Sequence, residues 1–120
     1  MSTPVLLIED DPLLAETVGD MLRHLGHEPD TTFDGLQALH RMAEGLRPRL
    51  VLTDLQMPGM GGLEVIQHFR EHWPGVPVVA MTGEPDPRLL TRAEVLGARA
   101  TLRKPFTLHQ LGQTLAGALA

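Results

Sequence analysis

Three short apolar runs constrain the fold of this chain more than any other feature of its sequence. They cover residues 5–8, 50–52 and 76–81, and none is long enough to form a helix. None shows the alternation of apolar and polar residues that is typical of a strand with one face in water. Continuous apolar runs of this length indicate strands that are buried on both faces, as in parallel sheets.

The segments between these runs have the spacing of amphipathic helices. Apolar residues recur every three or four positions in the ranges 14–25, 36–46, 66–73, 89–96 and 108–119. A fourth short strand is expected at 100–102, and a polar one at 28–32. Pro29 would remove a ladder hydrogen bond from that polar strand, so we expect the strand at an edge of the sheet.

The helix boundaries agree with five strand–helix units. Asp11 and Pro12 form a helix start, and Gly26, Gly45 and Gly97 fall near helix ends, where a positive φ is favourable. The predicted fold is therefore an α/β, doubly wound sandwich. In such folds ligands bind at the carboxyl ends of the strands, which is where we look for functional residues.

Length and composition exclude several classes of function. The 120 residues fit one domain, 1–120, with an ordinary globular composition. A net charge of −5 opposes direct nucleic-acid binding, and the absence of cysteine excludes disulfides and thiolate catalysis. The apolar run near the N-terminus is too short for a signal peptide or a membrane span, so we expect a cytoplasmic protein with no membrane partner.

Acidic and polar residues follow the predicted strands at their carboxyl ends. Glu9 and Asp10 come after the first strand, Asp54 after the third, Thr82 after the fourth and Lys104 after the fifth. Carboxylates this close together repel one another and raise each other's pKa unless a cation is bound. Oxygen ligands with open positions suit Mg²⁺, which keeps several waters and binds phosphate oxygens as well.

Four sequence motifs in order along the chain closely resemble those of response-regulator receiver domains of two-component signalling. They are IEDDP at 8–12, DLQMPGMGG at 54–62, MTG at 81–83 and KPF at 104–106. The resemblance covers the whole chain, and each motif lies at the end of a predicted strand. It implies a flavodoxin-like (βα)5 fold with five parallel strands in the order 2-1-3-4-5.

By this resemblance Asp54 is the phosphoryl acceptor, and the domain is a signalling phosphoacceptor rather than an enzyme. Asp10 and Asp54 would bind Mg²⁺ directly, Glu9 would act largely through water, and the backbone carbonyl of Gln56 would complete the metal site. This arrangement follows the general logic of phosphoryl transfer, in which the protein positions an in-line nucleophile and neutralises the charge on the phosphoryl oxygens.

The same resemblance assigns the remaining roles and the partners. Thr82 and Lys104 would hold phosphoryl oxygens, and Pro105 looks like the family's cis-proline. The phosphodonor would be a sensor histidine kinase or a phosphotransfer protein, and the downstream effector or output domain is not specified. The chain is expected to be either a stand-alone receiver or part of a larger regulator or hybrid kinase.

Three positions depart from the family pattern. Thr101 stands where receivers usually carry a tyrosine or phenylalanine that changes rotamer on activation, and the chain has no tyrosine. Gly61 stands where the family often has Asp or Asn, and Gly83-Glu84-Pro85 is an unusual combination after Thr82. We therefore expect Thr82 to take part in switching and the small residue Thr101 to contribute little.

Other classes of protein share parts of this pattern. An aspartyl-phosphate phosphatase would need an acid at Gln56, and a dinucleotide-binding domain would need glycines where Glu9 stands. An interaction module that no longer uses phosphate is the more serious alternative. His68 and His72 are four residues apart on a predicted helix and could share a metal, but without an evident third ligand a solvated helix face is the preferred interpretation.

Overall fold

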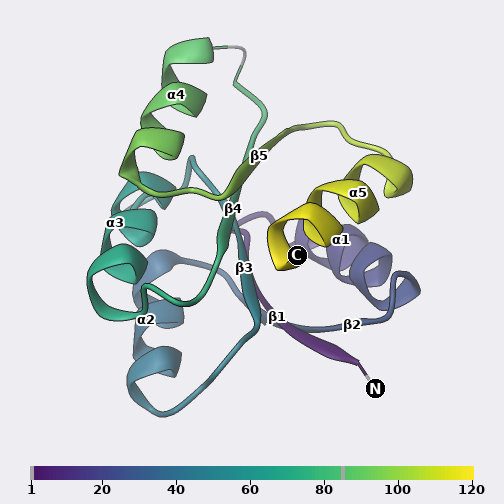
Figure 1. Ribbon diagram of the computed structural model, residues 1–120, viewed down its shortest axis with the longest axis horizontal. Coiled ribbons are helices and arrows are strands. Elements are labelled where there is room, and N and C mark those ends of the chain that lie inside the picture. Colours follow the sequence, from purple (N-terminus) through teal and green to yellow (C-terminus); the bar gives the residue numbers. More distant parts are fainter. Residues whose placement is uncertain (1, 85) are drawn as a thin grey trace.

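Five parallel strands form one sheet in the order β2-β1-β3-β4-β5, as the family resemblance implied. The computed structural model describes residues 2–84 and 86–120. Figure 1 shows the strands alternating with helices along the chain. The strands are β1 Thr3–Ile8, β2 His27–Thr32, β3 Leu50–Asp54, β4 Val78–Thr82 and β5 Ala100–Arg103, and the helices are α1 Pro12–His24, α2 Gly35–Ala43, α3 Gly62–His72, α4 Pro87–Leu96 and α5 Leu108–Leu119.

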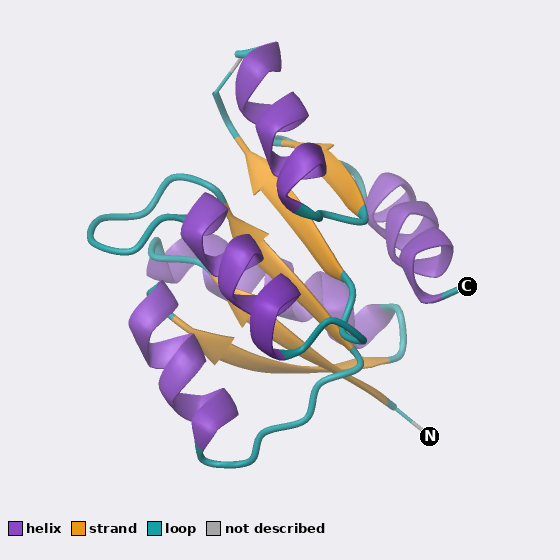
Figure 2. Ribbon diagram, turned by 60° about the vertical axis from the view of Figure 1, so that its left-hand side comes forward, coloured by secondary structure: helices purple, strands orange, loops and turns teal. Residues whose placement is uncertain are grey.

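Helices cover both faces of the sheet, with α1 and α5 on one face and α2, α3 and α4 on the other (Figures 1 and 2). Successive residues of a strand point to opposite faces, so Leu6 and Ile8 contribute to one core and Val5 and Leu7 to the other. Both cores are apolar, which explains why the central strands appear in the sequence as unbroken apolar runs.

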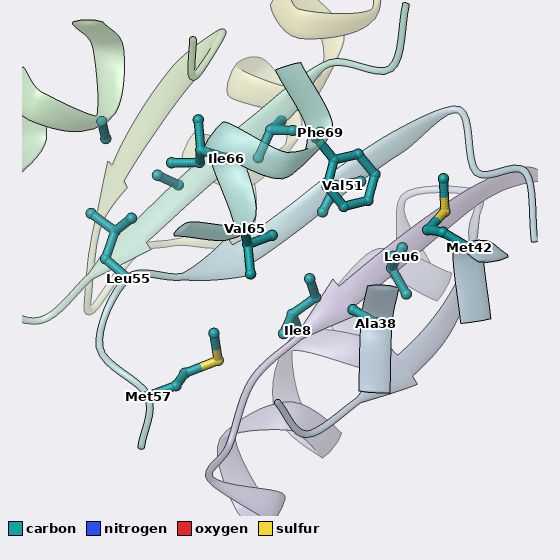
Figure 3. Close-up of a cluster of buried hydrophobic side chains, with 13 residues drawn as sticks. Leu6, Ile8, Ala38, Met42, Val51, Leu55, Met57, Val65, Ile66 and Phe69 are labelled. Atoms are coloured by element: carbon teal, nitrogen blue, oxygen red, sulfur yellow. The ribbon is translucent and has the colours of Figure 1, made fainter. Parts of the chain in front are cut away.

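The core under α2, α3 and α4 is drawn in Figure 3. It joins Leu6 and Ile8 of β1 to Ala38 and Met42 of α2, and Phe69 of α3 lies fully buried within it. The second core contains Leu22 of α1 and both Leu111 and Leu115 of α5. Burial of such side chains contributes about 1.5–3 kcal/mol each. These two layers hold the sheet rigid and fix the positions of the loops at its carboxyl edge.

The edge strand β2 and the helix ends lie where the proline and the glycines of the sequence predicted them. Pro29 lies in β2, which pairs only with β1 among the described strands, so its missing N–H breaks no central ladder. Gly26, Gly45 and Gly97 have φ values of 88°, 111° and 122°, as their positions after helices predicted. The structure begins β4 at Val78, after Pro77, two residues later than the start of the apolar run.

Helix α4 is the least embedded of the five helices. Ala93 is its one buried residue among those that the structure describes, whereas Val95 is 71% exposed. Arg70 of α3 lies along Gly97 and donates a hydrogen bond to the Val95 carbonyl oxygen at 3.1 Å, which ties the two helices together. Among the described helices, none is both long and apolar enough to cross a membrane.

Candidate functional site

Three carboxylates meet at the carboxyl ends of β1 and β3. Glu9, Asp10 and Asp54 each place one oxygen within 4.8 Å of the others. Glu9 is 1% exposed and Asp54 is 5% exposed, while Asp10 is half-buried. The two strands are hydrogen-bonded neighbours in the sheet, with Ile8 paired to Thr53, so their following residues are held side by side.

Lys104 reaches this cluster from the loop after β5. Its Nζ lies 2.9 Å from Glu9 Oε1 and 3.3 Å from Asp54 Oδ2. The Lys104–Pro105 peptide bond is cis, as the family resemblance implied. The cation therefore bridges two buried carboxylates and offsets part of their mutual repulsion.

Burial and neighbouring charges shift the pKa values of both Glu9 and Lys104. Burial raises the pKa of Glu9 to about 7, although hydrogen bonds from Lys104 and from the Asp11 N–H lower it in part. Burial alone would lower the pKa of Lys104, but the hydrogen bond to Glu9 and the charge of Asp54 outweigh this effect and raise it. Such strain among acids is what a divalent cation would relieve.

The backbone around Asp54 fixes the direction of its carboxylate. Asp54 Oδ1 accepts a hydrogen bond from the Gln56 N–H at 3.2 Å, and the Thr53 hydroxyl donates to the Asp54 carbonyl oxygen at 2.9 Å. Gly62 opens α3 directly against this turn: a Cβ there would lie only 2.6 Å from Leu55 Cα and closer still to the Asp54 carbonyl oxygen. Gly62 closes the motif at 54–62, but no local pattern in the sequence indicates this close approach.

Thr82 lies at the end of β4, buried beside β3. Its Oγ1 accepts a hydrogen bond from the Glu84 N–H at 3.0 Å. Thr101 is half-buried in β5 between Ala100 and Leu102, which belong to the α1/α5 core, so its side chain faces the α4 side of the sheet. Of the unusual 83–85 segment, Pro85 lies outside the described residues.

The remaining residues singled out by the sequence are not part of the acidic cluster. They form helix caps or lie farther along α3. Asp11 caps α1, because its side chain accepts hydrogen bonds from the N–H groups of Leu13 and Leu14 at 3.0 and 3.3 Å. Gly61 is the N-cap of α3 and makes no side-chain cap bond. His68 and His72 lie at the far end of α3 from Gly62.

Comparisons with known proteins agree with this geometry. The model of the response regulator receiver domain family matches residues 5–116. The transcriptional regulatory protein CrdR of Helicobacter pylori is 38% identical over 112 residues, covering 92% of this chain and 52% of that protein. The DNA-binding response regulator MtrA of Mycolicibacterium smegmatis is 39% identical over 111 residues, covering 92% of this chain and 48% of that protein. The chain thus spans about half the length of these relatives.

Solved structures show the same fold. The chemotaxis response regulator CheY4 of Vibrio cholerae superposes with a TM-score of 0.89 at 29% identity, covering 99% of this chain and 100% of that one. A receiver domain from Clostridium thermocellum superposes with a TM-score of 0.91 at 25% identity, covering 98% of this chain and 94% of that one. The chain belongs to the response regulator receiver domain family, whose members are phosphoacceptor domains of two-component signalling rather than true enzymes.

Proposed function

We propose that residues 1–120 form one receiver domain that accepts a phosphoryl group on Asp54 in a Mg²⁺-dependent reaction. The observation that carries this proposal is the junction of three carboxylates and one ammonium at the carboxyl edge of the sheet, with Lys104 Nζ 3.3 Å from Asp54 Oδ2. The donor would be a histidine kinase or phosphotransfer protein, in keeping with the family.

In this reaction an Asp54 carboxylate oxygen attacks the phosphorus of a phosphohistidine. A phosphorus–oxygen bond forms, the phosphorus–nitrogen bond breaks, and its electron pair leaves on the donor imidazole. The hydrogen bond from the Gln56 N–H holds one Asp54 oxygen, so the carboxylate is already oriented before a donor arrives. The product is an acyl phosphate on the aspartate.

The residues fit a hard divalent cation. Asp10 and Asp54 would hold Mg²⁺ directly with the Gln56 carbonyl, and Glu9 through water, because carboxylate and carbonyl oxygens are the ligands that this ion prefers. Bound Mg²⁺ would supply charge neutralisation for the phosphoryl oxygens. Lys104 would share its ammonium with the phosphoryl group, and the Thr82 hydroxyl, which accepts a hydrogen bond from the Glu84 N–H, has its own proton to donate to a phosphoryl oxygen.

Phosphorylation of Asp54 would then alter contacts with an effector or an output domain. The relatives named above are transcriptional and DNA-binding regulators about twice as long as this chain. The net charge of −5 disfavours nucleic-acid contact by the receiver itself, so we assign it the role of a switch that acts on another protein surface.

The test is labelling with acetyl phosphate or a phosphorylated donor in the presence of Mg²⁺, read by intact mass. We expect a single phosphoryl adduct that does not form when excess EDTA is present from the start and is absent in Asp54→Asn, because an amide cannot form the acyl phosphate. Asp34→Asn, at the N-cap of α2 and outside the group of three carboxylates, is the matched control and should label normally. A wild-type chain that folds and takes no label from any donor would support the phosphate-independent interaction module instead.

A further inference from the structure

A pair of histidines on α3 lies outside the machinery described above. His68 and His72 are one helical turn apart, and their imidazole rings are stacked with centroids 5.9 Å apart and planes inclined by 21°. Residues at this spacing lie on the same side of a helix. We propose that His68 and His72 chelate a late divalent transition-metal ion, with Cu²⁺ bound most tightly.

The ring geometry suits a shared ion. Two imidazoles bound to one ion through nitrogen bonds of about 2.0–2.1 Å have centroids roughly 4.5–6.5 Å apart, and the observed 5.9 Å falls within this span. The stacked rings would have to turn about the last side-chain torsion to direct their nitrogens at one ion, and that torsion is broad for histidine. Imidazole is a good ligand for Cu²⁺, Ni²⁺ and Zn²⁺, and affinity rises to Cu²⁺ along the series.

The electrostatic surroundings also favour a cation. His72 is the last residue of α3, where the negative end of the helix dipole and its free carbonyl groups attract positive charge. Arg70 lies between the two histidines in the sequence and carries a positive charge. Its guanidinium donates a hydrogen bond to the Val95 carbonyl oxygen of α4, so it is engaged elsewhere. His68 is half-buried, so ordering its side chain around an ion costs less entropy than ordering a fully exposed one.

This site differs in kind from the acidic cluster. Among the described residues, the one group of three or more acidic or histidine ligands is Glu9, Asp10 and Asp54, so the histidine pair offers two protein ligands and leaves the other positions to water. Its two residues lie about 9 and 15 Å along α3 from the helix start that abuts Asp54, at a rise of about 1.5 Å per residue. A two-ligand site of nitrogen donors selects transition metals over Mg²⁺ and holds them exchangeably.

Trp73 provides a direct measurement. It is the one tryptophan in the chain, and its ring centroid lies 5.8 Å from that of His72. Cu²⁺ has an open d shell and quenches indole fluorescence at short range. We expect CuCl2, added to the full chain in saturating Mg²⁺, to quench Trp73 saturably with one equivalent, and EDTA to restore the emission. Mg²⁺ alone should leave the emission unchanged.

Variants decide whether the two histidines act together. His68→Gln and His72→Gln should each remove most of the quenching, and the double variant should remove no more than either single one, because a chelate needs both rings. His109→Gln, at an exposed position of α5, is the matched control and should retain the wild-type response. Circular dichroism of each variant establishes that it is folded, and electron paramagnetic resonance of the Cu²⁺ complex should show two coupled nitrogens.

Two results would overturn the proposal. Wild-type quenching in folded His68→Gln and His72→Gln would place the ion elsewhere. Independent, additive losses in the two variants would mean two separate single-histidine contacts rather than one chelate.

Discussion

At the scale of single residues, Gly62 links the fold to the proposed phosphorylation site. Any side chain there would meet the backbone of Asp54 and Leu55, which cannot move without displacing the carboxylate that the Gln56 N–H orients. The position therefore requires glycine for space, although its backbone needs no positive φ.

We predict that Gly62→Ala lowers the free energy of unfolding by about 1–3 kcal/mol, the usual range for overpacking a well-filled site. Gly75→Ala is the control, because a Cβ at Gly75 meets nothing within 4 Å. Urea denaturation of the two variants measures the difference. Equal stability of Gly62→Ala and wild type would show that the turn after Asp54 yields easily, contrary to the packing.

The burial of His27 makes the stability of the folded protein depend on pH. Burial lowers its pKa, and its Nδ1 is buried without a hydrogen-bond partner among the described residues. A depressed pKa means that the folded state binds the proton less readily than the unfolded chain. The contribution of His27 to stability is therefore present above its unfolded pKa of about 6.5 and is lost as the pH falls through the folded value.

We predict that His27→Gln loses less stability than wild type when the pH is lowered from about 7.5 to about 5.5, a range that spans the histidine pKa. The buried acid Glu9, whose pKa is raised, contributes with the opposite sign, but it does so equally in both proteins. Urea unfolding at both pH values, each without metal, gives the comparison. Parallel losses in the two proteins would contradict a perturbed His27.

At the scale of elements, the β4–α4 connection and α4 are the parts best placed to move. Thr82 ends β4 and binds the Glu84 N–H through its hydroxyl, so a phosphoryl group that draws this hydroxyl away would release that backbone contact. Helix α4 follows directly and buries only Ala93 among its described residues. Thr101 faces α4 from β5 but has few rotamers to exchange.

We predict that Thr82→Ala uncouples binding of beryllofluoride, a phosphoryl mimic, from the spectral shifts of residues 83, 84 and 86–96. Thr101→Ala should leave those shifts nearly intact. NMR of both variants with Mg²⁺ and the mimic provides the measurement. Loss of the shifts in Thr101→Ala, with the mimic still bound at Asp54, would make Thr101 the switch and our hypothesis wrong.

The sequence predicted the elements well because their causes are local. Continuous apolar runs define buried strands, Pro29 marks the edge strand, and glycines mark helix ends. Contacts between distant segments could not be predicted from spacing. The bridge from Lys104 to Glu9, the fit of Gly62 against Asp54 and the bond from Arg70 to Val95 depend on three-dimensional packing, which no local pattern encodes.

At the scale of the whole molecule, the acidic cluster is a source of strain that a cation would relieve. Glu9, Asp10 and Asp54 concentrate negative charge in a chain that is already at −5 overall, with Lys104 as their ammonium partner. An ion that binds only the folded protein stabilises it by mass action.

We predict that millimolar Mg²⁺ raises the melting temperature. The free energy of unfolding should increase with Mg²⁺ concentration by RT ln(1 + [L]/Kd), which is about 2.7 kcal/mol at 100 times Kd. Asp10→Asn should flatten this response, and Asp20→Asn, on the exposed face of α1, should preserve it. Differential scanning calorimetry makes the measurement. A melting temperature indifferent to Mg²⁺ would argue against a metal site at these carboxylates.

The ion pair between Lys104 and Glu9 joins residues that are 95 positions apart in the chain. Because β3 and β4 lie between β1 and β5 in the sheet, this contact needs every intervening unit to have been synthesised and these four strands to lie side by side. Contacts of such long range are slow to form and are the costliest in loop entropy. A nascent or truncated chain would therefore carry Asp54 without its ammonium partner, and competence to receive a phosphoryl group would coincide with completion of the fold.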